Sequence, residues 1–265
     1  LRSNSTNLGA ISEIFRGPVT GCNDFFFLDN KNEWLKEIES EYLFDIIRRP
    51  AECKTIKTSF SERGMTLFSS SVGKYNLNGT SALKYISEGE LTEVLVKKGQ
   101  NKGQKVIGYH NLPTTKTRGI WYNVNIRKPA PILWMEIMGS SHRVFYNDEN
   151  LIHSDKFYGI YPKNNNDVDP LKLCIWLNST PVMLHKLLSS FNSLGLGALK
   201  TPVYEVANIP IPNNLNSIEL NSDALESILT RPINDVALEV HEEDRILLEA
   251  PIYELLGLSK SDEDA

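Results

Sequence analysis

Cysteines and long apolar runs are scarce in this sequence of 265 residues. The three cysteines, Cys22, Cys53 and Cys174, are widely separated and odd in number, which argues against a disulfide framework and fits a reducing cytosol. No window approaches the ~20 consecutive apolar residues that a membrane-spanning helix needs, and the N-terminal region has no signal-peptide pattern. We therefore expect a soluble, cytoplasmic chain without a membrane partner.

The motifs of a self-contained active site are also missing. The 5 histidines have no metal-ligand spacing, and the patterns CxxC, HExxH and GxSxG do not occur. The phosphate-binding patterns GxGxxG and GxxxxGK[ST] are absent, and the run Gly195-Leu196-Gly197 follows a predicted helix, which indicates a helix-exit turn. The sequence therefore predicts a non-catalytic chain that holds no metal and no cofactor of its own.

The acidic excess is confined to the C-terminal part of the sequence. The formal net charge is −5, but residues 1–200 contain 25 Lys and Arg against 19 Asp and Glu, whereas residues 201–265 contain 3 against 14. The first part is therefore basic, at +6, and the last part acidic, at −11. A weakly acidic total does not exclude an anionic partner for the basic part.

Basic residues concentrate in the segment Arg48–Lys128, which has 15 Lys and Arg against 5 acidic residues, interleaved with aromatic side chains. This pattern is typical of nucleic-acid-binding surfaces. The cations are densest in residues 97–105, where Gly, Gln and Asn separate lysines that suit phosphates from amides that suit base edges. Charge alone does not distinguish a DNA-binding loop from a solvent-exposed hairpin tip that its lysines keep soluble. The residues that we expect to contact DNA are Lys97, Lys98, Asn101, Lys102, Lys105, Lys116, Arg118, Arg127 and Lys128.

The secondary structure expected for the first half of the sequence is mostly strands and loops. Apolar residues at three- and four-residue spacing predict one helix over residues 32–49, which Pro50 ends. A turn rich in Gly, Thr and Asn precedes Phe25–Leu28, which we expect to form a short buried strand. The stretch Thr55–Val144 is rich in β-branched and aromatic residues and is broken at intervals by Gly, Asn or Pro, which favours strands over helices.

Helix signals dominate the second half. Asp169 is a suitable N-cap for a helix that begins at Pro170. A second helix follows the Ser179-Thr180 pair and is expected to end at Asn192 and Gly195. Ser222 opens an acidic part that we expect to form short helices, with a frayed end from Ser259 onward. The fold class we predict is α+β, with a β-rich region and its loops, then a helix pair, then a C-terminal helical tail.

Five motifs occur in an order shared with one known family. The turn Gly17–Asn23 and the Phe residues after it fit the pattern G-x-x-T-G-x-N-x-x-F. The other four follow it along the sequence: Arg118-Gly119-Ile120-Trp121-Tyr122 as an R-x-x-W-Y strand, Trp176-Leu177-Asn178-Ser179, Gly197 to Ile209-Pro210-Ile211-Pro212, and Arg245 to Leu258. Together they resemble the C-terminal target recognition domain of N6-adenine DNA methyltransferases from type IIG and related, type I-like restriction–modification systems.

The resemblance implies a division of labour between two parts of a longer enzyme. An upstream methyltransferase domain of the same chain would bind S-adenosylmethionine and methylate adenine N6. Residues 1–212 would bind double-stranded DNA and read the target site, with the acidic helical tail, residues 213–265, packed on them. The Gly-rich loop and the Asn/Asp-Pro-Pro-aromatic tetrad of the catalytic domain are absent. The nearest approach to the tetrad, Thr201–Tyr204, is interpreted as the start of a strand or loop, and the start at Leu1 suggests an excised part of a longer protein.

Some residues of these motifs are expected to shape the fold rather than to touch DNA. Gly17, Thr20, Gly21 and Asn23 form a structural turn motif, in which Gly21 takes a conformation that other residues resist. Trp121 and Tyr122 are expected in the core of a strand rather than as base-stacking platforms, and Asn178-Ser179 as a helix junction. Against the family pattern, Glu249 replaces an Asp and Pro251 interrupts a helix. The alternative function is a protein-interaction domain whose acidic tail docks on a basic partner.

Overall fold

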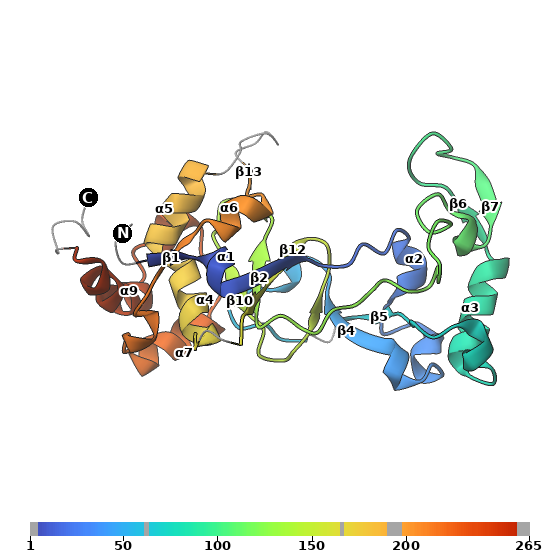
Figure 1. Cartoon of the computed structure of the whole chain (residues 1–265), viewed down its shortest axis with the longest axis horizontal. Helices are drawn as coiled ribbons and strands as arrows, with labels where there is room; N and C mark the ends of the chain where they lie inside the picture. The colour runs from blue at the N-terminus through green and yellow to red at the C-terminus, as the bar shows by residue number, and fades with distance from the viewer. Residues whose placement is uncertain (1–4, 61–63, 165–166, 190–197, 259–265) are drawn as a thin grey trace. The chain divides into compact units, whose positions relative to one another are not determined.

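The chain folds into two compact units, which we describe from a computed structural model of residues 5–60, 64–164, 167–189 and 198–258. Unit 1 comprises Leu1–Gly17, Arg49–Ser59 and Pro129–Ala265, and unit 2 comprises Pro18–Arg48 and Phe60–Lys128. Unit 2 is therefore built from two separate segments of the chain, each of which leaves unit 1 and returns to it (Figure 1).

Unit 1 is organised around a four-stranded antiparallel sheet with the strand order β10-β8-β12-β2. Ile160 of the central strand β12 lies opposite Ile132 on one side and Ile14 on the other, so the register brings apolar side chains together. The strands of this sheet are β2 (Ser12–Arg16), β8 (Ile132–Met135), β10 (Val144–Tyr146) and β12 (Phe157–Pro162). Two short antiparallel pairs join β1 (Ser5–Asn7) to β14 (Pro210–Pro212) and β9 (Ile137–Met138) to β13 (Leu199–Lys200), and β11 is Ile152–His153.

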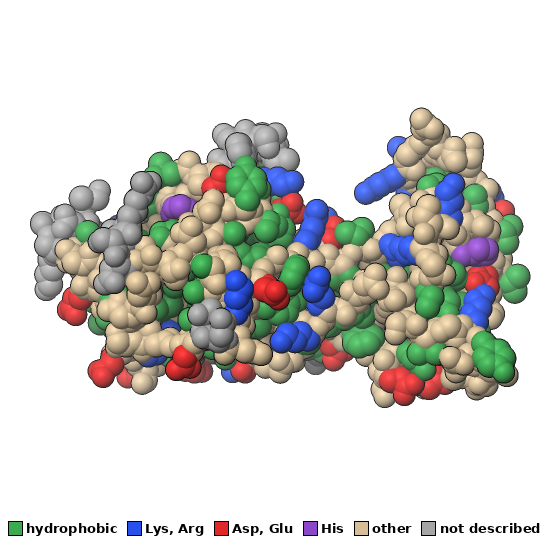
Figure 2. All heavy atoms as spheres, viewed as in Figure 1, with side chains coloured by type: hydrophobic (Ala, Val, Ile, Leu, Met, Phe, Trp, Pro, Cys, Tyr) green, Lys and Arg blue, Asp and Glu red, His purple; other side chains and the backbone are tan. Residues whose placement is uncertain are grey.

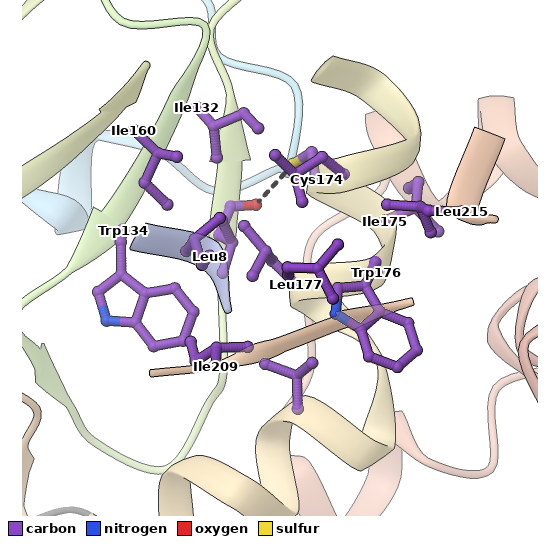
Figure 3. Close-up of a cluster of buried hydrophobic side chains, with 14 of the residues drawn as sticks. Leu8, Ile132, Trp134, Ile160, Cys174, Ile175, Trp176, Leu177, Ile209 and Leu215 are labelled. Atoms are coloured by element: carbon purple, nitrogen blue, oxygen red, sulfur yellow. Dashed lines mark hydrogen bonds between the residues drawn. The ribbon is translucent and has the colours of Figure 1, made fainter. Parts of the chain in front are cut away.

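Helices supply the other half of the unit 1 core. The helices are α1 (Leu8–Ile11), α4 (Pro170–Asn178), α5 (Thr180–Ser189), α6 (Val203–Ala207), α7 (Ser222–Thr230), α8 (Val236–Glu239) and α9 (Glu243–Leu256), with 3-10 turns at Pro50–Glu52 and Leu215–Ser217. Figure 3 shows side chains of α4 meeting Leu8, Trp134 and Ile209 in one apolar cluster. The tail helices α7 and α9 bury Ile228 and Leu248 in the same cluster, so the acidic tail is part of the unit 1 core.

Two motifs that lie far apart in the sequence meet in this core. The buried Asn178 side chain accepts a hydrogen bond from the Val144 N–H (2.9 Å) and donates one to the Val144 carbonyl (2.8 Å), which joins the end of α4 to strand β10. Arg245 of α9 donates to the Asn178 carbonyl (2.8 Å) and pairs with Glu249 (3.0 Å), whose carboxylate accepts from the Thr180 N–H (2.8 Å). The motif that ends at Asn178-Ser179 and the motif that begins at Arg245 therefore form one buried helix junction.

Unit 2 contains a small antiparallel sheet, one regular helix and a separate hairpin. In the sheet, β5 pairs with β3 on one side and with β4 on the other. The elements are α2 (Asn23–Phe26), β3 (Phe27–Leu28), β4 (Leu43–Ile47), β5 (Met65–Phe68), α3 (Ser81–Leu91), β6 (Glu93–Leu95) and β7 (Lys105–Ile107), with 3-10 turns at Glu33–Lys36, Ser40–Tyr42, Lys74–Leu77 and Tyr109–Asn111.

An aromatic cluster forms the core of unit 2. The Phe25 ring stacks on Tyr85 at 4.7 Å between centroids and lies 4.5 Å from Trp121. A Cβ atom added at Gly89 of α3 would lie 2.6 Å from the Phe25 ring, so this glycine permits the helix to approach the cluster. Trp121 and Tyr122 are buried, and the Trp121 indole N–H donates to Glu90 (2.8 Å). They are core residues, as predicted.

Several predicted elements are confirmed. The helix and strand content is mixed, as an α+β fold requires, and helices lie at the C-terminus. Helix α4 begins at Pro170, and the Asp169 carboxylate accepts hydrogen bonds from the N–H groups of Leu171 and Lys172. Helix α5 begins at Thr180 and α7 at Ser222. The predicted end of the second helix, the Gly195-Leu196-Gly197 turn and the frayed residues from Ser259 onward lie outside the described residues.

The predicted helix over residues 32–49 is wrong. The segment forms two 3-10 turns and strand β4, since the Asn32 side chain accepts from the Trp34 N–H and β4 gains its backbone partners from β5. The opposite error occurs at α3, where strands were expected. Thr80 caps this helix through the Leu83 N–H (3.1 Å), a local signal that the β-rich composition of the surrounding stretch obscures. The expected strand Phe25–Leu28 is only half correct, because α2 takes its first two residues.

Three further predictions about the family motifs need correction. Residues 118–122 form a bend and a turn instead of a strand, and the Arg118 N–H donates to the Thr115 carbonyl (2.9 Å). Of Thr201–Tyr204, the first two residues form a loop, as expected, but Val203 and Tyr204 already belong to helix α6. Pro251 does not interrupt α9, because Leu248 and Ile252 on either side of it are both buried and hold the helix in place.

Candidate nucleic-acid interface

The β6–β7 hairpin carries most of the cations that the sequence singled out. Its two strands pair through Val94 and Val106, and one face packs on a small apolar cluster of Val94, Val96 and Leu112. The other face exposes Leu95 and Ile107. The hairpin is therefore anchored on one side only, and Figure 1 shows a long loop joining its strands.

The tip loop, residues 96–104, has a defined backbone. The Val96 N–H donates to the Gln104 carbonyl (2.9 Å) and the Gly103 N–H to the Val96 carbonyl (2.9 Å), which extends the ladder beyond β6 and β7. Gly99 and Gly103 have φ values of +85° and +90°, which only glycine adopts without strain. All side chains of residues 97–105 are exposed. The loop thus holds its polar side chains outward on a folded turn.

The four lysines of the hairpin fall into two classes. Lys97 forms an ion pair with Asp24, and Lys105 pairs with Glu93 at 2.7 Å. Lys98 and Lys102 form no ion pair with any residue that the structure describes. Asn101 lies beside Lys102 at the turn, where its carbonyl accepts from the Gln104 N–H (3.1 Å). The unneutralised charge of the hairpin therefore sits at its tip.

Arg118 is partly buried against the turn at residues 19–23. Its Nη2 atom donates to the Val19 carbonyl (2.9 Å), and its guanidinium lies 5.7 Å from the centroid of the Phe26 ring. Burial lowers the pKa of Arg118. Its Nη1 atom is buried and has no hydrogen-bond partner among the described residues. Arg118 therefore supports the turn through Nη2, and the N–H donors of Nη1 are not used within the described residues.

Gly17, Thr20, Gly21 and Asn23 shape the same stretch of chain. In unit 1, a Cβ atom added at Gly17 would lie 2.2 Å from the Ser154 carbonyl oxygen, so no other residue fits there. In unit 2, Gly21 has φ of +79°, as predicted, and its carbonyl accepts from the Thr114 hydroxyl (2.8 Å). The Thr20 hydroxyl donates to the Asn23 side chain (2.6 Å). These contacts fix the backbone of the turn. A structural role rather than a DNA contact for these four residues stays a prediction.

An open hollow of about 480 Å³ lies beside Arg118. Its lining includes Val19 and two asparagines, Asn123 and Asn125, that the sequence-based prediction missed. Asn125 has φ of +49°, and its N–H donates to the Asn123 side chain (2.8 Å). The sequence could have indicated this turn through the Asn-x-Asn spacing directly after Trp121-Tyr122, because asparagine tolerates the left-handed conformation and forms such turns.

The remaining predicted cations, Lys116, Arg127 and Lys128, are exposed. They belong to residues 94–128 of unit 2, which contain eight Lys and Arg and no Asp or Glu. The exposed acids of unit 2, such as Glu33, Glu37 and Glu41, precede this stretch. Figure 2 shows Lys and Arg side chains over the part of unit 2 that carries the hairpin and a red group at the lower end of the unit. The charges of unit 2 are thus segregated along the sequence, and in space Asp24 and Glu93 meet two of the hairpin lysines.

The described residues offer no metal site and no activated thiol. No group of three or more His, Cys, Asp or Glu among them is arranged to hold a metal ion. Burial raises the pKa of both Cys22 and Cys53 to about 12, which disfavours their thiolates. No helix in this part of the chain is long and apolar enough to cross a membrane. The chemistry of the candidate site is therefore that of cations, amides and backbone groups.

The solved structures that match this chain include two extended matches of low sequence identity. The type IIG restriction endonuclease BpuSI matches with a TM-score of 0.54 and 17% identity over 96% of this chain and 32% of that one. The type IIL restriction–modification enzyme MmeI, solved in complex with DNA, matches with a TM-score of 0.55 and 12% identity over 98% of this chain and 35% of that one. The chain thus spans about a third of the length of these enzymes and shares their fold in that part.

No curated protein is similar enough to this chain to count as a match. The family comparison is decisive instead. Residues 2–247 match the model of the C-terminal domain of the type II methyltransferase M.Eco57I. This span contains the first four motifs and the beginning of the fifth, at Arg245, and it confirms the resemblance to the C-terminal region of restriction–modification methyltransferases. The chain belongs to the M.Eco57I C-terminal domain family.

Proposed function

We propose that this chain is the DNA-reading part of a restriction–modification methyltransferase. The observation that carries the proposal is the acid-free stretch of residues 94–128, whose exposed cations lie on a folded hairpin and the loops after it. Such a surface suits the phosphate backbone, which supplies most of the affinity of proteins for DNA. Family membership supports the proposal, because a domain of such a methyltransferase works on DNA.

In the proposed enzyme, chemistry and recognition belong to different domains. This sequence has neither the Gly-rich loop nor the Asn/Asp-Pro-Pro-aromatic tetrad, so its residues do not fit S-adenosylmethionine or a flipped adenine. The methyltransferase domain would hold both. This chain would bind the duplex through Lys98, Lys102, Lys116, Arg127 and Lys128, and its contacts would offset the few kcal/mol that base flipping costs.

The candidate DNA contacts differ in the partners that they already have within the chain. Lys97 and Lys105 have acidic partners, and the Arg118 guanidinium is committed to the Val19 carbonyl. We expect these three to contribute less to affinity than Lys98 and Lys102, which have no ion pair with a described residue.

Duplex binding at graded salt concentrations tests the proposal. If the five cations proposed to bind the duplex contact phosphates, the logarithm of the association constant falls with the logarithm of salt concentration at a slope of about −4.5. The measurement is fluorescence anisotropy with a labelled pool of random duplexes. Absence of binding at low salt, or a slope near zero, would contradict the proposal.

A further inference from the structure

We infer that the β6–β7 hairpin enters the major groove of duplex DNA. In this arrangement Lys98 and Lys102 contact phosphates at the edges of the groove, while the amides of Gln100, Asn101 and Gln104 face the base edges. The inference rests on the proposed function and adds to it the element, the groove and the side chains that read the sequence.

The shape of the hairpin selects the groove. It is a two-stranded ribbon, and no third described strand pairs with β6 or β7. Paired strands lie about 4.8 Å apart, and their side chains widen the ribbon further. The major groove of B-DNA, about 12 Å wide, admits such a ribbon, whereas the minor groove, about 6 Å wide, is too narrow for it.

The base of the hairpin is fixed, while the end of its tip loop is uncovered at Gly99 and Gly103. At the base, the Gly108 N–H donates to the Thr92 carbonyl (2.7 Å), and a Cβ atom at Gly108 would lie 2.6 Å from the Glu90 carbonyl oxygen. At the tip, a Cβ atom at Gly99 or Gly103 would meet nothing within 4 Å. A fixed base and an uncovered tip suit an element that recognises bases, because its side chains must reach the DNA from a defined position.

The chemistry of the tip suits base edges as well as phosphates. An amide side chain presents one donor and one acceptor together, which matches N6 and N7 of adenine in the major groove. Gln100, Asn101 and Gln104 are three such amides within five residues, all exposed. The lysines nearest the strands, Lys97 and Lys105, are neutralised by Asp24 and Glu93, so the charge available to DNA flanks these amides.

The first experiment establishes the preferred duplex and then removes the tip cations. The wild-type chain selects duplexes from a random pool, and the selected sequence becomes the probe. K98A/K102A is expected to weaken binding about 10-fold or more and to reduce the salt slope by about 2, since each lost phosphate contact removes about 0.9. The matched control is K31A/K36A, which removes two exposed lysines from the same unit and should leave affinity and slope close to wild type.

The second experiment asks which groove is read. Replacing adenine by 7-deazaadenine removes the N7 acceptor of the major groove, and replacing guanine by inosine removes the N2 amino group of the minor groove. We expect 7-deaza probes to bind about 10-fold more weakly at one or more positions and inosine probes to bind normally. N101A should reduce discrimination against other bases about 10-fold at one position while keeping the salt slope.

The possible failures are distinguishable. If the wild-type chain binds no duplex, the proposed function fails and the inference fails with it. If the wild-type chain selects a sequence but K98A/K102A and N101A behave as the control does, or if only inosine probes lose affinity, the hairpin does not read the major groove although the chain still binds DNA. Circular dichroism and thermal melting establish that each variant is folded, which the exposure of these side chains makes us expect.

Discussion

The two units of this chain use their charges in opposite ways. Unit 1 contains 14 Lys and Arg against 22 Asp and Glu, and unit 2 contains 14 against 11, so their net charges are −8 and +3. In unit 1 the Arg245 side chain is 3% exposed and lies between Glu239 and Glu249. In unit 2 the Lys97 side chain that meets Asp24 is 65% exposed. The charged network of unit 1 is thus buried in its core, whereas the ion pair of unit 2 lies at the surface.

The largest loss of unfolding free energy is expected when Arg245, the central cation of the buried network in unit 1, is replaced. R245A would leave Glu239, Glu249 and the Asn178 carbonyl without their buried donor. Breaking one partner of a buried ion pair costs about 3–5 kcal/mol of unfolding free energy. Urea denaturation measures this loss. A loss below about 1 kcal/mol would show that the network is dispensable and that the contrast between the units is wrong.

The next effect concerns Lys186, a buried cation of unit 1 without an acidic partner. Its ammonium lies 4.5 Å from the centroid of the Trp134 ring and has no hydrogen bond to a described residue, and burial lowers its pKa to about 7. K186M is expected to stabilise the protein by about 1–4 kcal/mol at pH 7 because an apolar side chain of similar length has no desolvation cost. The exposed K54M is the matched control in unit 1.

The pH dependence of this gain provides a check on its cause. Between pH 7 and the ordinary lysine value of 10.5, the unfolded chain holds the Lys186 proton and the folded chain does not. Wild-type stability therefore rises with pH in this window through Lys186, and the advantage of K186M should shrink as the pH rises. An advantage that stays constant from pH 7 to pH 9 would exclude buried charge as its origin.

Acid should weaken unit 1 through two buried histidines. Burial lowers the pKa of His153 to about 4, and burial, together with the nearby Lys186, lowers that of His142 well below 6.5. Both are neutral when folded and gain a proton when unfolded, so stability falls as pH drops below 6.5, by about 1.4 kcal/mol per pH unit for each histidine. Urea midpoints at pH 7.0 and 5.5 measure this loss, and equal midpoints would contradict it.

The smallest effect is expected at the ion pair of unit 2. K97A should change the unfolding free energy by about 0–1 kcal/mol, because exposed ion pairs gain little in water. D24N removes the same pair from the other side and should give a similar value. A loss comparable to that of R245A would mean that the surface charges of unit 2 are structural.

Local signals predicted the elements that local contacts specify. Asp169 before Pro170 predicted α4 correctly because a cap satisfies N–H groups only two and three residues away. The apolar spacing in residues 32–49 fits a helix equally well, yet the segment forms β4 because β5, a distant strand, supplies its backbone partners. Such pairing is invisible in a window of the sequence.

The candidate site shows the same division. Composition identified the lysines of the tip loop, since cations separated by Gly, Asn and Gln stand out in the sequence. It did not show that Lys97 meets Asp24, 73 positions away, or that Arg118 reaches the Val19 carbonyl. The basic segment Arg48–Lys128 also divides between the units, because Arg49, Lys54 and Lys57 belong to unit 1.

The two-segment construction of unit 2 has a consequence for exchanging specificities between enzymes. Strands β3 and β4 come from the first segment and their shared partner β5 from the second, and Glu39 of the first segment accepts hydrogen bonds from the N–H groups of Ser81 and Ala82 at the start of α3 in the second. A chimera that receives only residues 60–128 would thus pair a foreign β5 with native β3 and β4. Both segments, residues 18–48 and 60–128, must be transplanted together for the graft to keep its own sheet.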